Sequence, residues 1–109
     1  MKTKVEYIPS MEHFKNYSIY KDYPDVFKPT DKFPIDEIKI DKKYFDFPNP
    51  ISEEDVNYII NNFCLDGWEP IMINNDYFLI DGQNRLEAAK RMGLKYIDVI
   101  IIDTGALKA

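Results

Sequence analysis

The residues best placed to do chemistry occupy five consecutive positions, 81–85, with the sequence Asp-Gly-Gln-Asn-Arg. They follow an apolar run that predicts a buried strand, and they precede a helical pattern that runs to Met92 and ends at Gly93. The first N–H groups of a helix lack intrahelical partners and carry partial positive charge, so an arginine beside them completes a site for phosphate or carboxylate. We therefore expect an anion to bind at Gly82, Gln83, Asn84 and Arg85.

Each residue of this segment also has a purely structural interpretation. Asp81 could cap the following helix through its carboxylate, a role that is compatible with chemistry. Gly82 could serve the turn alone, and Gln83 and Asn84 could be turn residues without a ligand. Arg85 could be a solvated residue of the first turn, or it could pair with Asp81 or Glu87. Because a cation is disfavoured at a helix N-terminus, Arg85 needs a negative partner there, and we favour a bound anion.

Capping residues and apolar spacing indicate the elements that position this segment. Ser52 precedes three acidic residues and then apolar residues at helical spacing, which predicts a helix that ends at Gly67. Residues 70–73 and 77–80 predict two short strands. They are joined by a tight hairpin at 74–76, where Asn and Asp tolerate a positive φ.

Two further strands complete the expected sheet. Residues 35–41 alternate at Ile38 and Ile40, and residues 96–102 are rich in β-branched side chains. The resulting order is strand, helix, strand, strand, helix, strand. It predicts a small α+β domain, assigned to residues 35–109, in which two main helices pack on a mixed sheet.

Residues 1–34 are expected to form an N-terminal arm. Ser10 favours the start of a short helix, and Pro24, Pro29 and Pro34 indicate turns in the rest of the arm. Such an arm could wrap the core. It could also form the interface of a homodimer or bind a protein partner.

The composition is that of one small acidic domain. The chain has 109 residues, 45% of them hydrophobic and 30% charged, with a formal net charge of −5. This charge repels DNA, so DNA binding is expected only indirectly or weakly, through local cations such as Arg85, Lys90 and Arg91. Cys64 is the single cysteine, which excludes an intrachain disulfide, and its apolar context predicts a buried thiol.

The sequence carries no recognisable targeting or membrane signal. Its start lacks the apolar segment of a signal peptide, and no apolar run reaches membrane-spanning length. We therefore expect a cytoplasmic protein without a membrane partner. Zinc-ligand spacing, a nucleophile elbow and a Walker loop are also missing from the sequence.

Taken together, these residues resemble the ParB/sulfiredoxin superfamily over about residues 35–103. The likeness rests on Glu69-Pro70-Ile71 after a helix, on the hairpin, and on the spacing Asp-Gly-x-x-Arg-x-x-Ala-Ala that starts at Asp81. Members share a small α+β fold whose glycine-to-arginine turn binds nucleotide phosphates. They include partition proteins that bind cytidine triphosphate, sulfiredoxins that use ATP, and free-serine kinases.

The resemblance implies a role for each residue of the turn. Gly82 matches the turn glycine, which lets the backbone approach phosphate closely, and Arg85 matches the phosphate-binding arginine. Asp81 matches the acid of the kinase-like members, so it is the expected catalytic residue, assisting metal or proton chemistry. Gln83 and Asn84 occupy the two variable positions between them.

The resemblance also points to Trp68 and Glu69 as pocket residues. Trp68 could stack on a base or pack in the core, and Glu69 could stand beside a metal ion or be a solvated loop residue. The implied cofactor is Mg²⁺ together with a nucleoside triphosphate. The metal ligands stay unassigned, because the sequence does not show which aspartates approach Asp81. The candidates are Asp41, Asp46 and Asp66.

The positions at which this chain departs from the family pattern reduce the number of family reactions that it could catalyse. Sulfiredoxins carry a catalytic cysteine at the position of Gln83, followed by a histidine, so sulfiredoxin chemistry is rejected here. Partition proteins carry glutamate and a second arginine where this chain has Gln83 and Asn84, which weakens the charge available to phosphate. The variant with Gln most resembles members found near phage or mobile-element DNA functions.

Three functions follow as hypotheses. The first is a ParB-like nucleotide-binding domain, with NTP hydrolysis or phosphotransfer, in a DNA-partition or mobile-element system. The second is a non-enzymatic protein-interaction module of a DNA-associated system, acting through residues 1–34. The third is a metal-dependent ParB-like nuclease, whose metal site needs several convergent carboxylates.

Overall fold

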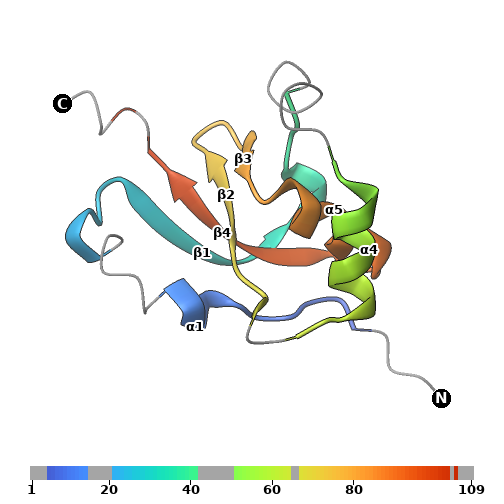
Figure 1. The fold of residues 1–109 in the computed structure, drawn as a ribbon. Helices are drawn as coiled ribbons and strands as arrows, with labels where there is room; N and C mark the ends of the chain where they lie inside the picture. The colour runs from blue at the N-terminus through green and yellow to red at the C-terminus, as the bar shows by residue number, and fades with distance from the viewer. Residues whose placement is uncertain (1–4, 15–20, 42–50, 65–66, 104, 106–109) are drawn as a thin grey trace.

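The computed structural model describes residues 5–14, 21–41, 51–64, 67–103 and 105. Within these residues it is a small α+β domain with one mixed sheet, as predicted (Figure 1). The strands lie in the order β1-β4-β2-β3. The elements are α1 (Met11–Phe14), β1 (Phe27–Pro34), the 3₁₀ turn η1 (Ile35–Glu37), α4 (Glu53–Asn61), β2 (Ile71–Asn74), β3 (Leu79–Asp81), α5 (Gln83–Arg91) and β4 (Tyr96–Ile102).

Strand β4 is central to the sheet. It pairs antiparallel with β1 on one side and parallel with β2 on the other. Residues 97–100 are buried, as expected for a run of β-branched side chains covered on both faces. The predicted strand 96–102 is therefore confirmed residue for residue.

Strand β1 lies within the segment predicted to be a proline-punctuated arm, and the expectation of turns at Pro29 and Pro34 is wrong. Both prolines are tolerated because β1 is an edge strand, where a missing N–H leaves no ladder bond unmade. The strand contains a bulge between Thr30 and Phe33, where Lys32 has a φ of 54°.

The strand predicted over residues 35–41 is also wrong. Residues 35–37 form η1, and Lys39 makes only an isolated parallel bridge to Phe78. The apolar alternation is nevertheless meaningful, because Ile35 and Ile38 are buried in the core. Alternation alone does not distinguish a strand from a short 3₁₀ turn followed by extended chain.

Helix α4 begins as predicted. The Ser52 hydroxyl accepts a 3.2 Å hydrogen bond from the backbone N–H of Asp55. The predicted end at Gly67 is wrong, because the helix ends at Asn61 and Gly67 does not have a positive φ. The prediction of a buried Cys64 thiol is wrong for the same reason: Cys64 lies beyond the helix and is exposed.

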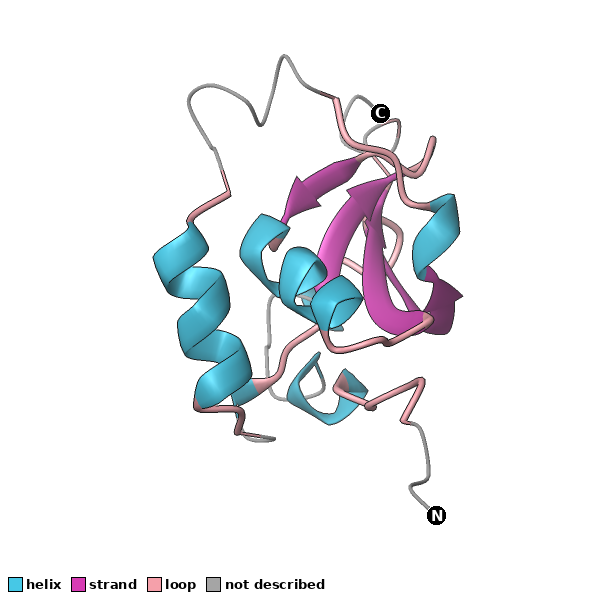
Figure 2. Cartoon of the chain, turned by 90° about the vertical axis from the view of Figure 1, so that its right-hand side faces the viewer, coloured by secondary structure: helices cyan, strands magenta, loops and turns pink. Residues whose placement is uncertain are grey.

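Helix α5 lies between α4 and the sheet (Figure 2). Its buried side chains are Leu86, Ala88 and Ala89, and the small alanines allow close packing on both sides. At its end, Gly93 has a φ of 84°, and the N–H of Leu94 donates to the Ala89 carbonyl. This is a Schellman motif, so the predicted glycine stop is confirmed.

The hairpin between β2 and β3 is confirmed. The prediction that an Asn or Asp of the turn has the positive φ is wrong. Tyr77, rather than an Asn or Asp, has a φ of 70°. The side-chain Oδ1 of Asn74 accepts 2.9 Å hydrogen bonds from the N–H groups of Asp76 and Phe78. These two bonds close the turn, and the left-handed backbone conformation of Tyr77 lets the chain reverse its direction.

The N-terminal segment runs alongside the sheet before it reaches α1 (Figure 1). The Glu6 carbonyl accepts from the N–H of Lys95, and the Ser10 N–H donates to the fully buried carboxylate of Asp98. Helix α1 starts after Ser10 as predicted, and the Ser10 hydroxyl also donates to Asp98. Residues 1–4 and 15–20 of the predicted arm lie outside the described residues.

No helix in the described part of the chain is long and apolar enough to span a membrane.

Candidate functional site

The turn between β3 and α5 brings the predicted site residues together. Gly82 is the N-cap residue of α5 and has a φ of 100°. A Cβ at this position would lie 2.6 Å from Cγ2 of Ile71, so both the backbone conformation and the packing require glycine. Asp81 is therefore not the helix cap, which corrects that interpretation.

The first turn of α5 leaves backbone N–H groups without acceptors inside the helix. The earliest α-helical bond is the 2.9 Å one from the Leu86 N–H to the Gly82 carbonyl. The N–H groups of residues 83–85 precede it and have no intrahelical acceptor. They supply the partial positive charge expected of an anion site.

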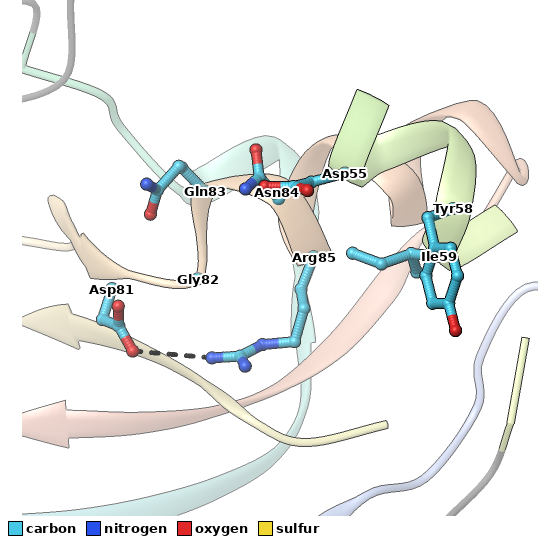
Figure 3. Close-up of a pocket in the computed structure, with 8 residues that line it drawn as sticks. All are labelled: Asp55, Tyr58, Ile59, Asp81, Gly82, Gln83, Asn84 and Arg85. Carbon is cyan, nitrogen blue, oxygen red and sulfur yellow. Dashed lines mark ion pairs between the residues drawn. The ribbon is translucent and has the colours of Figure 1, made fainter. Parts of the chain in front are cut away.

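The Arg85 side chain lies beneath this turn, close to two carboxylates (Figure 3). Its Nη2 is 3.6 Å from Oδ2 of Asp81, and its Nη1 is 3.8 Å from Oε2 of Glu69. Both distances exceed those of a charge-assisted hydrogen bond. Arg85 Nε is buried and, among the described residues, has no hydrogen-bond partner. The guanidinium is thus attracted to both carboxylates without saturating its donors.

Asn84 connects α5 to α4. Its side-chain Oδ1 accepts a 3.0 Å hydrogen bond from the backbone N–H of Ser52, the N-cap residue of α4. Arg91 joins the same two helices at the other end of α5. Its guanidinium donates two 2.7 Å hydrogen bonds to Glu53 and one of 2.9 Å to Glu87. These contacts hold α4 beside the turn.

A cleft of about 400 Å³ lies between the turn and α4. Its volume is within the range of small-molecule sites. Residues 81–85 form one wall, and α4 contributes the other through Asp55, Tyr58 and Ile59 (Figure 3). The sequence analysis missed the residues of α4. Asp55 and Tyr58 lie one turn apart on the polar face of that helix, but only the packing of α4 on α5 places them at the cleft.

Trp68 and Glu69, predicted as pocket residues, do not line this cleft. Trp68 is 2% exposed, and its Nε1 donates a 3.2 Å hydrogen bond to the Ile8 carbonyl. It is therefore a core residue, which is the second of the two interpretations given above. Glu69 is half-buried, and its carboxylate lies 3.8 Å from the Arg85 guanidinium.

Among the residues that the structure describes, the predicted metal ligands are not brought together. In the described ranges no three His, Cys, Asp or Glu side chains form a group that could hold a metal ion. Asp81 lines the cleft, and its side chain is 64% exposed. Asp46 and Asp66, two of the three other candidate ligands, lie outside the described residues.

The chain matches no family model and no curated protein. It does match solved structures. Two structures of pNOB8-like ParB N-domains, one of them a C2221 crystal form, match with TM-scores of 0.54 and 0.53 at 25% and 26% sequence identity. The matches cover 76% and 71% of this chain but 31% and 30% of theirs, so this chain spans about three-tenths of their length.

Sulfiredoxin from Arabidopsis thaliana matches with a TM-score of 0.55. That match covers 73% of this chain and 92% of the sulfiredoxin, at 19% sequence identity. At this level of identity the likeness shows the fold alone. Neither comparison assigns a ligand to residues 81–85.

Proposed function

Because this chain belongs to the ParB/sulfiredoxin superfamily, we propose that its β3–α5 turn binds the phosphates of a nucleoside triphosphate. The observation that carries the proposal is the cleft of about 400 Å³ with a helix N-terminus and Arg85 along one wall. Backbone N–H groups of residues 83–85 would hold the phosphate oxygens, and the guanidinium would bind them from below.

The two carboxylates beside Arg85 explain why this site would take its anion together with a cation. Asp81 and Glu69 both lie within 4 Å of the guanidinium, so a polyphosphate has to compete with them. Mg²⁺ is commonly held by one or two carboxylates and the phosphates of a substrate, and the exposed Asp81 fits that donor set. When bound there, the ion would offset charge on the phosphates and on Asp81.

Asp81 is also the residue that would orient a water molecule or an acceptor group, if the bound nucleotide is hydrolysed or transferred. Catalysis of this kind depends mainly on positioning and electrostatic stabilisation. The likeness to ParB N-domains supports a DNA-partition context, and we extend the proposal to partition or mobile-element systems.

The test is calorimetric titration of ATP, CTP, GTP and UTP, each with and without Mg²⁺, into the wild-type chain and Arg85→Ala. We expect saturable binding of at least one nucleotide, weakened roughly 10- to 100-fold by Arg85→Ala, since hydrogen bonds to charged groups contribute about 1.5–3 kcal/mol. Arg85→Lys retains the charge without the planar fork and should be intermediate.

Lys90→Ala serves as the matched control, because Lys90 is an exposed cation on the same helix and does not line the cleft. It should bind like the wild type. Absence of binding to the wild type at millimolar ligand would overturn the proposal, and attention would then turn to residues 1–34 as a protein interface. Metal-dependent DNA cleavage that Asp81→Asn abolishes would favour the nuclease instead.

A further inference from the structure

The wall of the cleft opposite the phosphate-binding turn carries an unusually exposed aromatic ring. Tyr58 is 68% exposed, the highest value among the exposed large hydrophobic side chains of the described residues. It lines the cleft together with Ile59, which is half-buried (Figure 3). An exposed aromatic ring at a cleft is a surface on which a flat ring can stack.

Asp55 lies one helical turn before Tyr58 and lines the same cleft. Its backbone N–H donates a hydrogen bond to the Ser52 hydroxyl, which caps the start of α4. A carboxylate here repels phosphate but accepts hydrogen bonds from neutral donors. The two walls of the cleft therefore differ in chemistry: Arg85 and the helix N-terminus attract anions, and Asp55 with Tyr58 favours an uncharged ring that bears donors.

We propose that Tyr58 and Asp55 form the nucleoside subsite of this cleft. This inference rests on the proposed function. The base stacks on the Tyr58 ring, and the Asp55 carboxylate accepts a hydrogen bond from a base amino group or a sugar hydroxyl. The ligand is thereby oriented with its phosphates at Gly82–Arg85 and its nucleoside against α4.

The experiment compares nucleoside triphosphates with inorganic tripolyphosphate, which has the phosphates but no ring. Both are titrated with Mg²⁺ into the wild type, Tyr58→Ala and Tyr58→Phe. We expect Tyr58→Ala to weaken nucleotide binding about 5- to 100-fold, the range of one base–aromatic stack, and to leave tripolyphosphate within about twofold of wild type. Tyr58→Phe retains a ring and should restore most of the nucleotide affinity.

Asp55→Ala is also expected to weaken the binding of nucleotides while leaving the binding of tripolyphosphate nearly unchanged. Its matched control is Glu54→Ala, an exposed acidic residue in the same first turn that does not line the cleft. If Asp55→Ala loses affinity for ATP, CTP and GTP but not for UTP, the hydrogen bond of Asp55 is assigned to a base amino group. An equal loss for all four nucleotides assigns it to the sugar.

The outcomes separate this inference from the proposed function. If Tyr58→Ala leaves nucleotide affinity unchanged, or weakens tripolyphosphate equally, the nucleoside subsite is wrong while phosphate binding stands. If the wild type binds neither ligand at millimolar concentration, both proposals fail. Upfield ring-current shifts of the base protons on binding to the wild type, lost in Tyr58→Leu, would report the stack independently of affinity.

Discussion

Tyr7 and Asp98 are 91 residues apart in the sequence, yet the Tyr7 hydroxyl donates a 2.6 Å hydrogen bond to Oδ1 of Asp98. Asp98 is fully buried on the central strand β4. Its carboxylate also accepts from the N–H groups of Ser10, at 2.7 Å, and Lys32, at 2.9 Å. A buried carboxylate is tolerated only when its oxygens are satisfied, so the N-terminal segment and the β1 bulge both stabilise the sheet through this one side chain.

This contact predicts a specific loss of stability at alkaline pH. Burial and the hydrogen bond to Asp98 raise the pKa of Tyr7 above its ordinary value of 10.0. The contribution of the neutral hydroxyl to stability is fully present below pH 10 and is lost as the pH rises from there toward the raised value. Because the acceptor is a carboxylate, Tyr7→Phe should lower the free energy of unfolding by about 1.5–3 kcal/mol at pH 7, and the difference from wild type should shrink above pH 10.

Urea unfolding of both proteins between pH 7 and 11 measures this difference directly. The other tyrosines and the lysines titrate equally in the two proteins. Any change with pH in the difference between the two free energies of unfolding is therefore due to Tyr7. Tyr23→Phe is the control, because Tyr23 is an exposed tyrosine and should behave like the wild type throughout. A constant difference from pH 7 to 11 would contradict the assignment.

Gly82 yields a second prediction, on the turn itself. Gly82→Ala forces a Cβ against Ile71 at 2.6 Å and places alanine at a φ of 100°. Overpacking and the left-handed conformation each cost on the order of 1–2 kcal/mol, so we expect a total near 2–4 kcal/mol in the free energy of unfolding. Gly67→Ala is the matched control, since a Cβ there meets nothing within 4 Å. Equal stability of the two variants in denaturant unfolding would show that the turn is not constrained as described.

The sequence predicts α5 and its flanking turns well because their signals are local. Glycines with a positive φ at both ends and an apolar face between them lie within a dozen residues. Strand β1 is missed because its partner β4 lies more than sixty residues away, and prolines are compatible with a strand only once it is known to be at an edge. The Asp98 contacts are likewise invisible, since nothing local distinguishes this aspartate from an exposed one.

The candidate site likewise has one part that the sequence predicts and one part that it does not. Residues 81–85 are contiguous, and their spacing predicts their proximity. The α4 wall is formed by tertiary packing that depends on the Asn84–Ser52 and Arg91–Glu53 bonds. Trp68 illustrates the converse, because it is adjacent in sequence to a site residue but its ring turns into the core, toward Phe63.

A third prediction concerns the Glu53–Arg91 pair that joins α4 to α5. The hydrogen bonds from Arg91 lower the pKa of Glu53 below its ordinary value of 4.5. A lowered pKa means that the stabilising contribution is present above pH 4.5 and is lost as the pH falls through the lowered value. Glu53→Gln should therefore be less stable than the wild type at pH 7, with the difference disappearing in acid. Thermal unfolding from pH 3 to 7 measures it, and Glu54→Gln, the neighbouring exposed acid, should show no such convergence.

The last prediction concerns the contact of Glu69 with Arg85. Glu69 lies 3.8 Å from the guanidinium and competes with any phosphate that binds there. Glu69→Gln removes that competition while retaining the size of the side chain. Because partly exposed ion pairs contribute about 0.2–1 kcal/mol, we expect tripolyphosphate to bind roughly 1.5- to 5-fold more tightly without Mg²⁺. Glu87→Gln, a change on α5 that pairs with Arg91 rather than Arg85, is the control. Weaker binding by Glu69→Gln would instead mean that Glu69 holds the guanidinium in its binding geometry, so that the carboxylate positions Arg85 rather than competing for it.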